Sequence, residues 1–372
     1  MTGREPIANA APAGGPSAVV PDAGPARAAA PRSGHQLPDV LDRRFVVVSG
    51  KGGVGKSTLA AAIGWAAASC GRRTCIVQLN TRDAMGPIFL GRDAVGYEPV
   101  RLDPRLPLWS VDLRPEPALR EYGLMKLRFA ALHKLVFENE VMRRLLRMVP
   151  GMTETLLLGK AWFMEAAEQD ASGRRRWDVL VVDAPSTGHG ISLLRLPETL
   201  LKVISVGPMA DDARQMQALL VDPTRTALHI ATLPAELPVN EALDLAGEAI
   251  GSIGLPSGWM IANQVLPGLA DGADCEALVA AVATSDDALL RHSLDNAQAM
   301  LRWREQQQTQ LRRLRQASPL PVVEVPHQLG PIHVAAVRAL AEQLCEAPSA
   351  QLAGGALARG VVGVSAPAAS SP

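Results

Sequence analysis

Short apolar runs rich in β-branched residues alternate along the chain with longer segments of helical periodicity. The runs, each bounded by glycine, proline or polar residues, predict strands at 45–49, 74–79, 108–113, 179–182, 202–206, 226–232, 258–263 and 319–325. The spacing of apolar residues between them predicts helices at 56–68, 211–220, 240–253, 291–317 and 331–344. Strands that alternate with helices are typical of an α/β fold, so we expect a mainly parallel central sheet flanked by helices.

A helical insertion interrupts this alternation at about residues 115–172. Leucine and methionine recur there at helical spacing, Pro150-Gly151 breaks the pattern, and a further apolar helix is expected over 156–166. The methionines in question are Met125, Met142, Met148, Met152 and Met164. Such a surface can adapt to hydrophobic clients, or the methionines can fill the core of a helical subdomain; both interpretations stay open.

The charge balance argues against a nucleic-acid partner. Lysine plus arginine and aspartate plus glutamate number 37 each, so the chain has no net field to attract nucleic acid or an acidic membrane. The four cysteines form no C-x-x-C pair, which fits a reducing cytosol. Residues 1–40 contain no apolar signal-like core, and no apolar run is long enough to span a membrane. We therefore expect a cytoplasmic protein without stable membrane insertion.

The chemistry begins at Phe45–Thr58, FVVVSGKGGVGKST. This stretch fits the phosphate-binding pattern G-x-x-x-x-G-K-[ST] in a strand–loop–helix context. The glycines allow successive backbone N–H groups to point at phosphate oxygens, and the helix N-terminus adds partial positive charge. Lys56 would reach the β- and γ-phosphates, and Ser57 would hold Mg²⁺. The residues predicted to cradle ATP are Gly52, Gly53, Val54, Gly55, Lys56, Ser57 and Thr58.

A second motif lies about 125 residues downstream of this loop. Val179–Val182 is a buried-strand pattern, and Asp183 falls at its end, where a carboxylate can act on Mg²⁺ beside Ser57. The polar, glycine-bearing segment 184–190, which includes His189, is expected to be a flexible loop that senses the γ-phosphate. Asn80, at the end of the second predicted strand, is expected to line another such switch.

Four segments together resemble the ArsA/Get-type anion-transporting ATPases over about residues 44–345. They are GKGGVGKST at 50–58, VPGMTETLLLGKAWF at 149–163, DAPSTGHGISLLRLP at 183–197 and Ala262-Asn263-Gln264 after a strand. The additional Lys51 resembles the deviant Walker A loop of these dimeric ATPases. The resemblance implies Mg-ATP hydrolysis in a dimer, with Lys51 reaching the phosphates of the other subunit. It also implies that Asn263 bonds adenine, that Pro326 lies along the base, and that a hydrophobic helical client surface is switched.

One departure from the family affects catalysis. The family has a water-positioning aspartate where this chain has Asn80, and an amide can orient water but cannot accept its proton. Asp83 is a weaker substitute because it lies three residues further on. Two interpretations follow: a P-loop ATPase domain over residues 41–346 that hydrolyses ATP, or an ATP-binding regulatory subunit with little or no hydrolysis.

Other departures narrow the partners. A zinc-binding C-x-x-C is absent and residues 115–170 contain no cysteine, so neither tail-anchor targeting nor arsenite transport is supported. A homodimer is expected, with a heterodimer of related ATPases as the alternative. A ParA/MinD-type positioning ATPase is disfavoured by the zero net charge and by a C-terminal tail without a basic amphipathic helix. Residues 1–40 and 347–372 are expected to be disordered because of their Ala-, Pro-, Gly- and Ser-rich composition.

Overall fold

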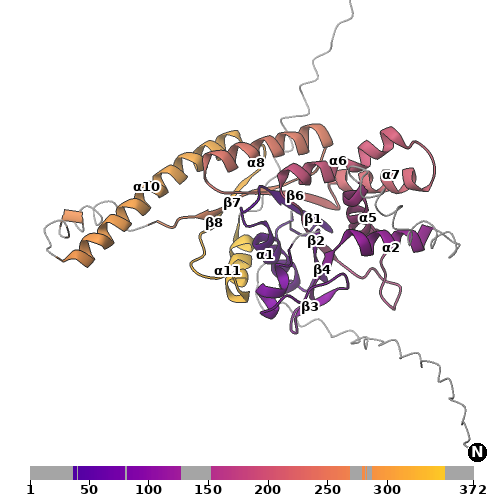
Figure 1. The fold of residues 1–372 in the computed structure, drawn as a ribbon, viewed down its shortest axis with the longest axis horizontal. Coiled ribbons are helices and arrows are strands. Elements are labelled where there is room, and N and C mark those ends of the chain that lie inside the picture. The colour runs from indigo at the N-terminus through magenta and orange to yellow at the C-terminus, as the bar shows by residue number, and fades with distance from the viewer. Residues whose placement is uncertain are drawn as a thin grey trace, which may run out of the picture.

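A twisted sheet flanked by helices forms the centre of the protein (Figure 1). The computed structural model describes residues 37–39, 41–79, 82–126, 152–268, 279–280, 282 and 287–347 of the 372-residue chain. The described strands are β1 (Phe45–Gly50), β2 (Thr74–Leu79), β3 (Val100–Asp103), β4 (Leu108–Leu113), β5 (Val179–Asp183), β6 (Thr226–Thr232), β7 (Ser257–Val265) and β8 (Val322–Pro326). They form one sheet in the order β3-β4-β2-β5-β1-β6-β7-β8, and every neighbouring pair is parallel except β3 and β4. The predicted mainly parallel α/β fold is confirmed.

Helices cover both faces of this sheet (Figure 1). The described helices are α1 (Lys56–Ser69), α2 (Pro115–Lys126), α5 (Met152–Ala166), α6 (Thr187–Val203), α7 (Pro208–Val221), α8 (Glu236–Glu248), α10 (Ala288–Ala317) and α11 (Val334–Glu346), with π-helical turns η1 (Gly86–Leu90) and η2 (Ala249–Ile253). The apolar cluster of one face contains α1 and α11, and the cluster of the other contains α5, α6, α7 and α8. Because both faces are covered, the central strands are mainly apolar and buried along their length: every residue of β1 is buried, with Phe45 and Val47 on one face and Val46 and Val48 on the other.

The helix after the phosphate loop is held tightly in place. Helix α1 is apolar on nearly all sides, as expected of a helix enclosed by protein, and it packs between the sheet and α11. Gly64 brings α1 close to β2, since a β-carbon there would come within 2.8 Å of the Ile76 side chain. This packing fixes the direction in which the N-terminus of α1 points.

Several predicted elements agree with the structure and two do not. The strands expected at 74–79, 108–113 and 226–232 have those bounds in the structure. The strand expected at 202–206 is wrong, because α6 continues through Val203 and residues 204–206 form a connection outside the sheet. The expected flexible loop at 184–190 is also shorter, since α6 already begins at Thr187 with Ser186 as its N-cap. The edge strand β3 and the turn η1 were not predicted.

The described part of the helical insertion is joined to the sheet by core packing. Leu157, Leu158, Ala161 and Met164 of α5 lie in the same apolar cluster as residues of β2, β4 and β5. Met164 is 2% exposed, so this methionine fills core. The predictions for 1–36, 127–151 and 348–372, which include Met142 and Met148 and most of both terminal segments, lie outside the described residues, and the predicted domain boundaries stay predictions.

Candidate nucleotide-binding site

The phosphate loop has the backbone that its glycines were expected to allow, with one exception. Gly50, Gly53 and Gly55 have φ of 144°, 83° and 91°, whereas Gly52 does not have positive φ. A β-carbon on Gly50 would lie 2.3 Å from the carbonyl oxygen of Ala231, and one on Gly55 would lie 2.2 Å from Asn263 Nδ2. The loop is therefore pressed against β6 and β7 at the two ends where the motif requires glycine.

The N-terminus of α1 opens directly from this loop. Its N-cap is Gly55, which has no side chain to accept hydrogen bonds from the first turn. The backbone N–H groups of Lys56, Ser57 and Thr58 are thus left uncapped by a side chain, as in helices that bind phosphate at this end. Gly52 lies beside the segment that follows Asp183, since a β-carbon on Gly52 would be 3.9 Å from Ser186 Cβ.

Lys56 is folded back over the loop. Its Nζ donates to the carbonyl oxygen of Lys51 at 2.9 Å. Burial lowers the pKa of Lys56, and the nearby Asp183 carboxylate partly opposes that shift. An ammonium group that is half-buried and close to the glycine loop is suited to bind phosphate oxygens.

Ser57 and Asp183, the two residues predicted to hold Mg²⁺, contact each other directly. Ser57 Oγ donates to Asp183 Oδ2 at 2.6 Å, while Asp183 Oδ1 is buried without a hydrogen-bond partner. Burial raises the pKa of Asp183 to about 6, although the Ser57 hydrogen bond and Lys56 act in the opposite direction. A hydroxyl and a buried carboxylate with an unpartnered oxygen are hard ligands that fit Mg²⁺, bound directly or through water. A bound cation would favour the charged form that burial disfavours.

Lys51 is engaged within its own chain. Its Nζ forms an ion pair with Glu241 Oε1 of α8 at 2.7 Å, and each side chain is about one-third exposed. The other carboxylate oxygen, Glu241 Oε2, is buried without a partner. Sequence reasoning did not identify Glu241; its position shortly after β6, whose C-terminal end meets the loop, is the signal that could have indicated it.

The two residues expected at the base lie together at the ends of β7 and β8. Asn263 is 6% exposed; its Nδ2 donates to the Val54 carbonyl at 2.8 Å and its Oδ1 accepts from the Gln264 N–H at 2.9 Å. Pro326 pairs in register with Val265. The structure thus brings Asn263 against the phosphate loop and places Pro326 on the neighbouring strand, and their roles toward a base stay predictions.

Asp83 anchors a turn in the structure. Its Oδ1 accepts from the Gly86 N–H and from Gln78 Nε2, and its Oδ2 accepts from the N–H groups of Ala94 and Val95. Burial alone would raise the pKa of Asp83, but these hydrogen bonds lower it below its usual value. A carboxylate with both oxygens occupied and a lowered pKa is a poor general base. Asn80 and the side chain of His189 lie outside what the structure describes.

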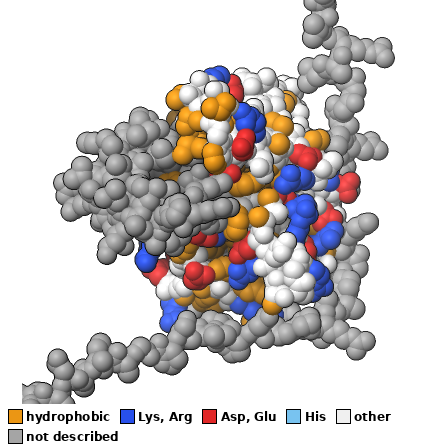
Figure 2. Space-filling model, turned by 90° about the vertical axis from the view of Figure 1, so that its right-hand side faces the viewer, with side chains coloured by type: hydrophobic (Ala, Val, Ile, Leu, Met, Phe, Trp, Pro, Cys, Tyr) orange, Lys and Arg blue, Asp and Glu red, His pale blue; other side chains and the backbone are white. Residues whose placement is uncertain are grey.

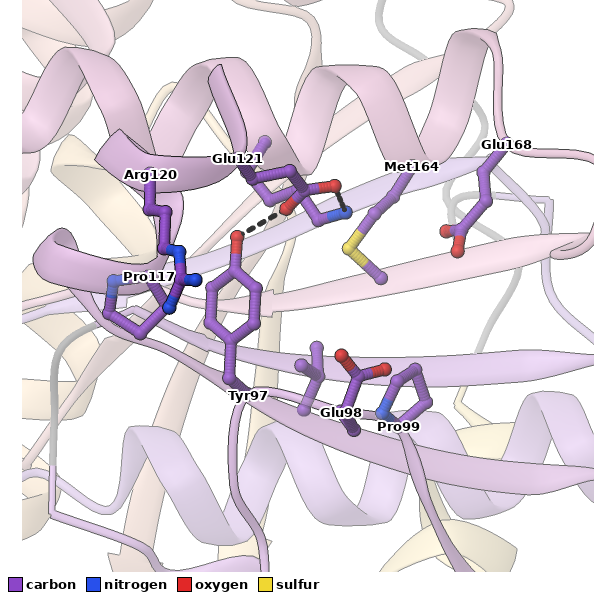
Figure 3. Close-up of a pocket in the computed structure, with 10 residues that line it drawn as sticks. Tyr97, Glu98, Pro99, Pro117, Arg120, Glu121, Met164 and Glu168 are labelled. Atoms are coloured by element: carbon purple, nitrogen blue, oxygen red, sulfur yellow. Dashed lines mark hydrogen bonds and ion pairs between the residues drawn. The ribbon is translucent and has the colours of Figure 1, made fainter. Parts of the chain in front are cut away.

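A separate cavity of about 440 Å³ lies at the base of the helical insertion (Figure 3). No residue of the phosphate loop lines it. Glu121 of α2 is its central group: it accepts from the Tyr97 hydroxyl at 2.5 Å and pairs with Lys160 Nζ of α5 at 2.7 Å. These contacts tie both helices to the segment before β3, and we call the three residues the insertion clasp.

The described residues include neither a membrane-spanning helix nor a metal-binding cluster. None of the helices in the described ranges combines the length and the apolar composition needed to cross a bilayer. Among the same residues, no cluster of three histidine, cysteine or acidic side chains has a metal-binding arrangement. The face drawn in Figure 2 shows acidic and basic side chains interspersed over its described part.

Comparison with known proteins identifies relatives of this chain. Residues 43–208 match the family model described as anion-transporting ATPase. The chain is 29% identical to ATPase ARSA1 of Chlamydomonas reinhardtii over 281 residues, which cover 60% of this chain and 35% of that protein. It is 29% identical to ATPase BagA of Mycobacterium tuberculosis over 235 residues, with 60% and 66% covered. It is 28% identical to the arsenical pump-driving ATPase of Acidiphilium multivorum over 254 residues, with 64% and 42% covered.

The matches therefore span between about a third and two thirds of the length of these relatives. They agree with the motifs, since the family match contains the phosphate loop, Asp183 and the start of α6. On this match and these relatives, residues 43–208 of the chain are similar to the ArsA-type anion-transporting ATPases.

Proposed function

We propose that this chain is a cytoplasmic, Mg-ATP-dependent ATPase that works as a dimer and switches a hydrophobic client or partner surface. The observation that carries the proposal is the Ser57–Asp183 pair beneath the phosphate loop, with one buried carboxylate oxygen left without a partner. A buried anionic oxygen is costly unless a cation meets it, and the adjacent loop is built for phosphates. ATP with Mg²⁺ supplies both groups.

Each residue then has a defined task. The loop N–H groups and Lys56 bind and orient the phosphates, and Ser57 and Asp183 hold Mg²⁺. When bound, Mg²⁺ neutralises charge on the phosphate oxygens. Lys51 would stabilise the transferring phosphoryl group bound by the partner subunit, which requires its ion pair with Glu241 to open first.

Helix α6 connects the nucleotide site to an apolar surface. It begins four residues after Asp183 and ends at Val203, and Val203 and Val206 beside its C-terminus are 80% and 79% exposed. A helix of 17 residues is about 25 Å long, so a shift at the Asp183 end can be transmitted to these valines. This arrangement supports a client or partner surface controlled by the nucleotide.

A second candidate is an ATP-binding switch with little or no hydrolysis. The observation that favours it is the engagement of Asp83, because the nearest carboxylate in sequence to Asn80 is occupied by four hydrogen bonds. Such a chain would hold ATP and pass its state to a partner, which could be a related ATPase in a heterodimer.

Steady-state hydrolysis of ATP with Mg²⁺ distinguishes the two candidates. The wild type is measured beside Lys56→Ala and Asn80→Asp. Turnover by the wild type that is lost in Lys56→Ala supports the ATPase. An inert wild type together with an active Asn80→Asp variant supports the switch. Equal turnover in the wild type and in Lys56→Ala would contradict both, because the activity would then come from elsewhere.

A further inference from the structure

The C-terminal end of β7 has an unusual backbone directly beside the phosphate loop. Gln264 has φ of 59° and is the only non-glycine residue with positive φ in the described ranges. A left-handed conformation at a residue with a β-carbon costs about 1–2 kcal/mol. The β7–β8 pairing also shifts register between Ala262 and Val265. Strain of this kind persists only where the surroundings hold it, and it concentrates at functional sites.

Gln307 of α10 holds this bend from the edge of β7 opposite β8. Its side chain is buried, with the residue 3% exposed. Its Nε2 donates to the Gln264 carbonyl at 3.1 Å, and its Oε1 accepts from the Leu266 N–H at 2.8 Å. The Gln264 carbonyl and the Leu266 N–H flank Val265. In a parallel sheet, a single residue of the neighbouring strand would form hydrogen bonds with both of these groups. Because β6 ends at Thr232, the Gln307 amide takes the place of a strand there.

The bend that Gln307 holds determines where Asn263 points. The Asn263 side chain is fixed by the Val54 carbonyl on one side and by the N–H of Gln264 on the other. If Gln264 relaxed to negative φ, that N–H would turn, and both Asn263 and the following backbone groups would move relative to the loop. Gln307 therefore acts on this segment without lying next to the phosphates.

We propose that Gln307 is a positioning residue that sets the preference of this site for adenine over guanine nucleotides. The inference rests on the proposed function, in which the loop binds a nucleoside triphosphate, and on the expectation from the sequence resemblance that the base lies near Asn263. Adenine and guanine present reversed donor and acceptor groups on their Watson–Crick edges, so discrimination depends on the exact placement of a few amide groups. The phosphates would be bound by the loop N–H groups and Lys56, whereas the hydrogen bonds of Gln307 go to Gln264 and Leu266.

The location of Gln307 on α10 also links the segment 263–266 to a helix that projects from the molecule. Figure 1 shows α10 projecting away from the sheet, and its buried residues are confined to Gln307, Leu311 and Leu314. Further toward the N-terminus of the helix, Met300 and Trp303 are exposed. Gln307 is thus the first buried residue of α10 in chain order, where the helix begins to pack against the rest of the protein. The segment 263–266 is therefore attached at the point where the projecting helix meets the sheet.

The test compares three ligands on the full chain by equilibrium binding with Mg²⁺: ATP, GTP and inorganic tripolyphosphate. Gln307→Met keeps the length of the side chain and removes both hydrogen bonds, and Gln306→Met is the matched control because Gln306 is exposed on the same helix. We expect Gln307→Met to weaken ATP on the order of tenfold, to narrow the ATP/GTP preference, and to leave tripolyphosphate binding unchanged. Gln306→Met should match the wild type for all three ligands.

Other outcomes separate this inference from the proposed function. Equal weakening of all three ligands, or no change in the ATP/GTP ratio, would overturn the role of Gln307 while the nucleotide site stands. A wild type that binds none of the three ligands would overturn the proposed function itself, and the inference with it. If Gln307→Met does not fold, Gln307→Glu replaces it: it keeps an acceptor for Leu266 but loses the donor to Gln264, and the same selective loss of ATP is expected.

Discussion

Replacing Asp183 by asparagine should stabilise the nucleotide-free protein while it abolishes binding of the metal. Burial raises the folded-state pKa of Asp183 to about 6, against an ordinary value of 3.8. Each pKa unit corresponds to about 1.4 kcal/mol, so the buried charge destabilises the folded state by at most about 3 kcal/mol above pH 6. Asparagine removes the charge but brings an N–H₂ group into the same buried place, so we expect a net gain of about 1–2 kcal/mol.

The pH dependence follows from the sign of the shift. Because the folded state binds this proton more tightly than the unfolded state, the wild type loses stability as the pH rises from about 4 to 6 and keeps the full penalty above that. The advantage of Asp183→Asn should therefore be largest at pH 8 and should fade toward pH 4. For a domain of this size, the gain corresponds to an increase in melting temperature of roughly 1.5–3 °C.

The assay is thermal unfolding of both proteins in EDTA at pH 8 and pH 4.5, and again at pH 8 with Mg-ATP. Asp93→Asn is the control, because Asp93 is an exposed aspartate outside the site. Mg-ATP should raise the melting temperature of the wild type and of the control but not that of Asp183→Asn. A melting temperature of Asp183→Asn no higher than that of the wild type in EDTA at pH 8 would contradict the cost of the buried charge. Stabilisation of Asp183→Asn by Mg-ATP as strong as that of the wild type would contradict the metal-binding role.

Three further substitutions test other parts of the structure. Glu241→Gln should change the free energy of unfolding by less than about 1 kcal/mol, since its ion pair with Lys51 is part-exposed. It should nevertheless lower the ATP concentration needed for dimerisation in sedimentation experiments, because Lys51 is then free to reach the partner subunit. An unchanged ATP concentration for dimerisation would argue against the ion pair as a restraint on Lys51. Glu165→Gln should cost roughly 2–4 kcal/mol in denaturant unfolding because two arginines converge on this buried carboxylate, and a loss below about 0.5 kcal/mol would contradict this. Tyr97→Phe should lower the free energy of unfolding by about 1 kcal/mol, because it removes the hydrogen bond to Glu121 in the insertion clasp. An unchanged free energy of unfolding in the same denaturant experiment would contradict this.

The sequence predicted the central sheet well because its strands are buried on both faces. A run such as Thr74–Leu79 is mainly apolar and β-branched and is followed by polar residues, so both its type and its bounds are visible without the structure. The segment 202–206 misled because the apolar residues that end α6 and follow it look like a short strand, although Val203 and Val206 are exposed. The helical start of α6 was missed because Thr187-Gly188-His189-Gly190 has turn-like composition, and tertiary context overrides that propensity.

The candidate site likewise contains residues that local sequence predicts and residues that only the folded structure brings together. The loop, Ser57 and Asp183 could be predicted because their roles are fixed by local motifs at strand ends. Glu241 and Gln307 could not, since each acts through one long-range side-chain contact: Glu241 with Lys51, 190 residues away, and Gln307 with Gln264 and Leu266, about 40 residues away. Nothing in the composition of their helices distinguishes them from neighbouring polar residues.

The most direct test of the nucleotide site is a calorimetric titration of ATP into the nucleotide-free protein, with Mg²⁺ and with EDTA, for the wild type and Lys56→Ala. We expect the wild type to bind one ATP per chain, and to bind it more weakly in EDTA because Ser57 and Asp183 then have no cation to share with the phosphates. Lys56→Ala should show no measurable binding. Absence of binding to the wild type, or equal affinity in the wild type and Lys56→Ala, would contradict the claim that this loop is a Mg-ATP site.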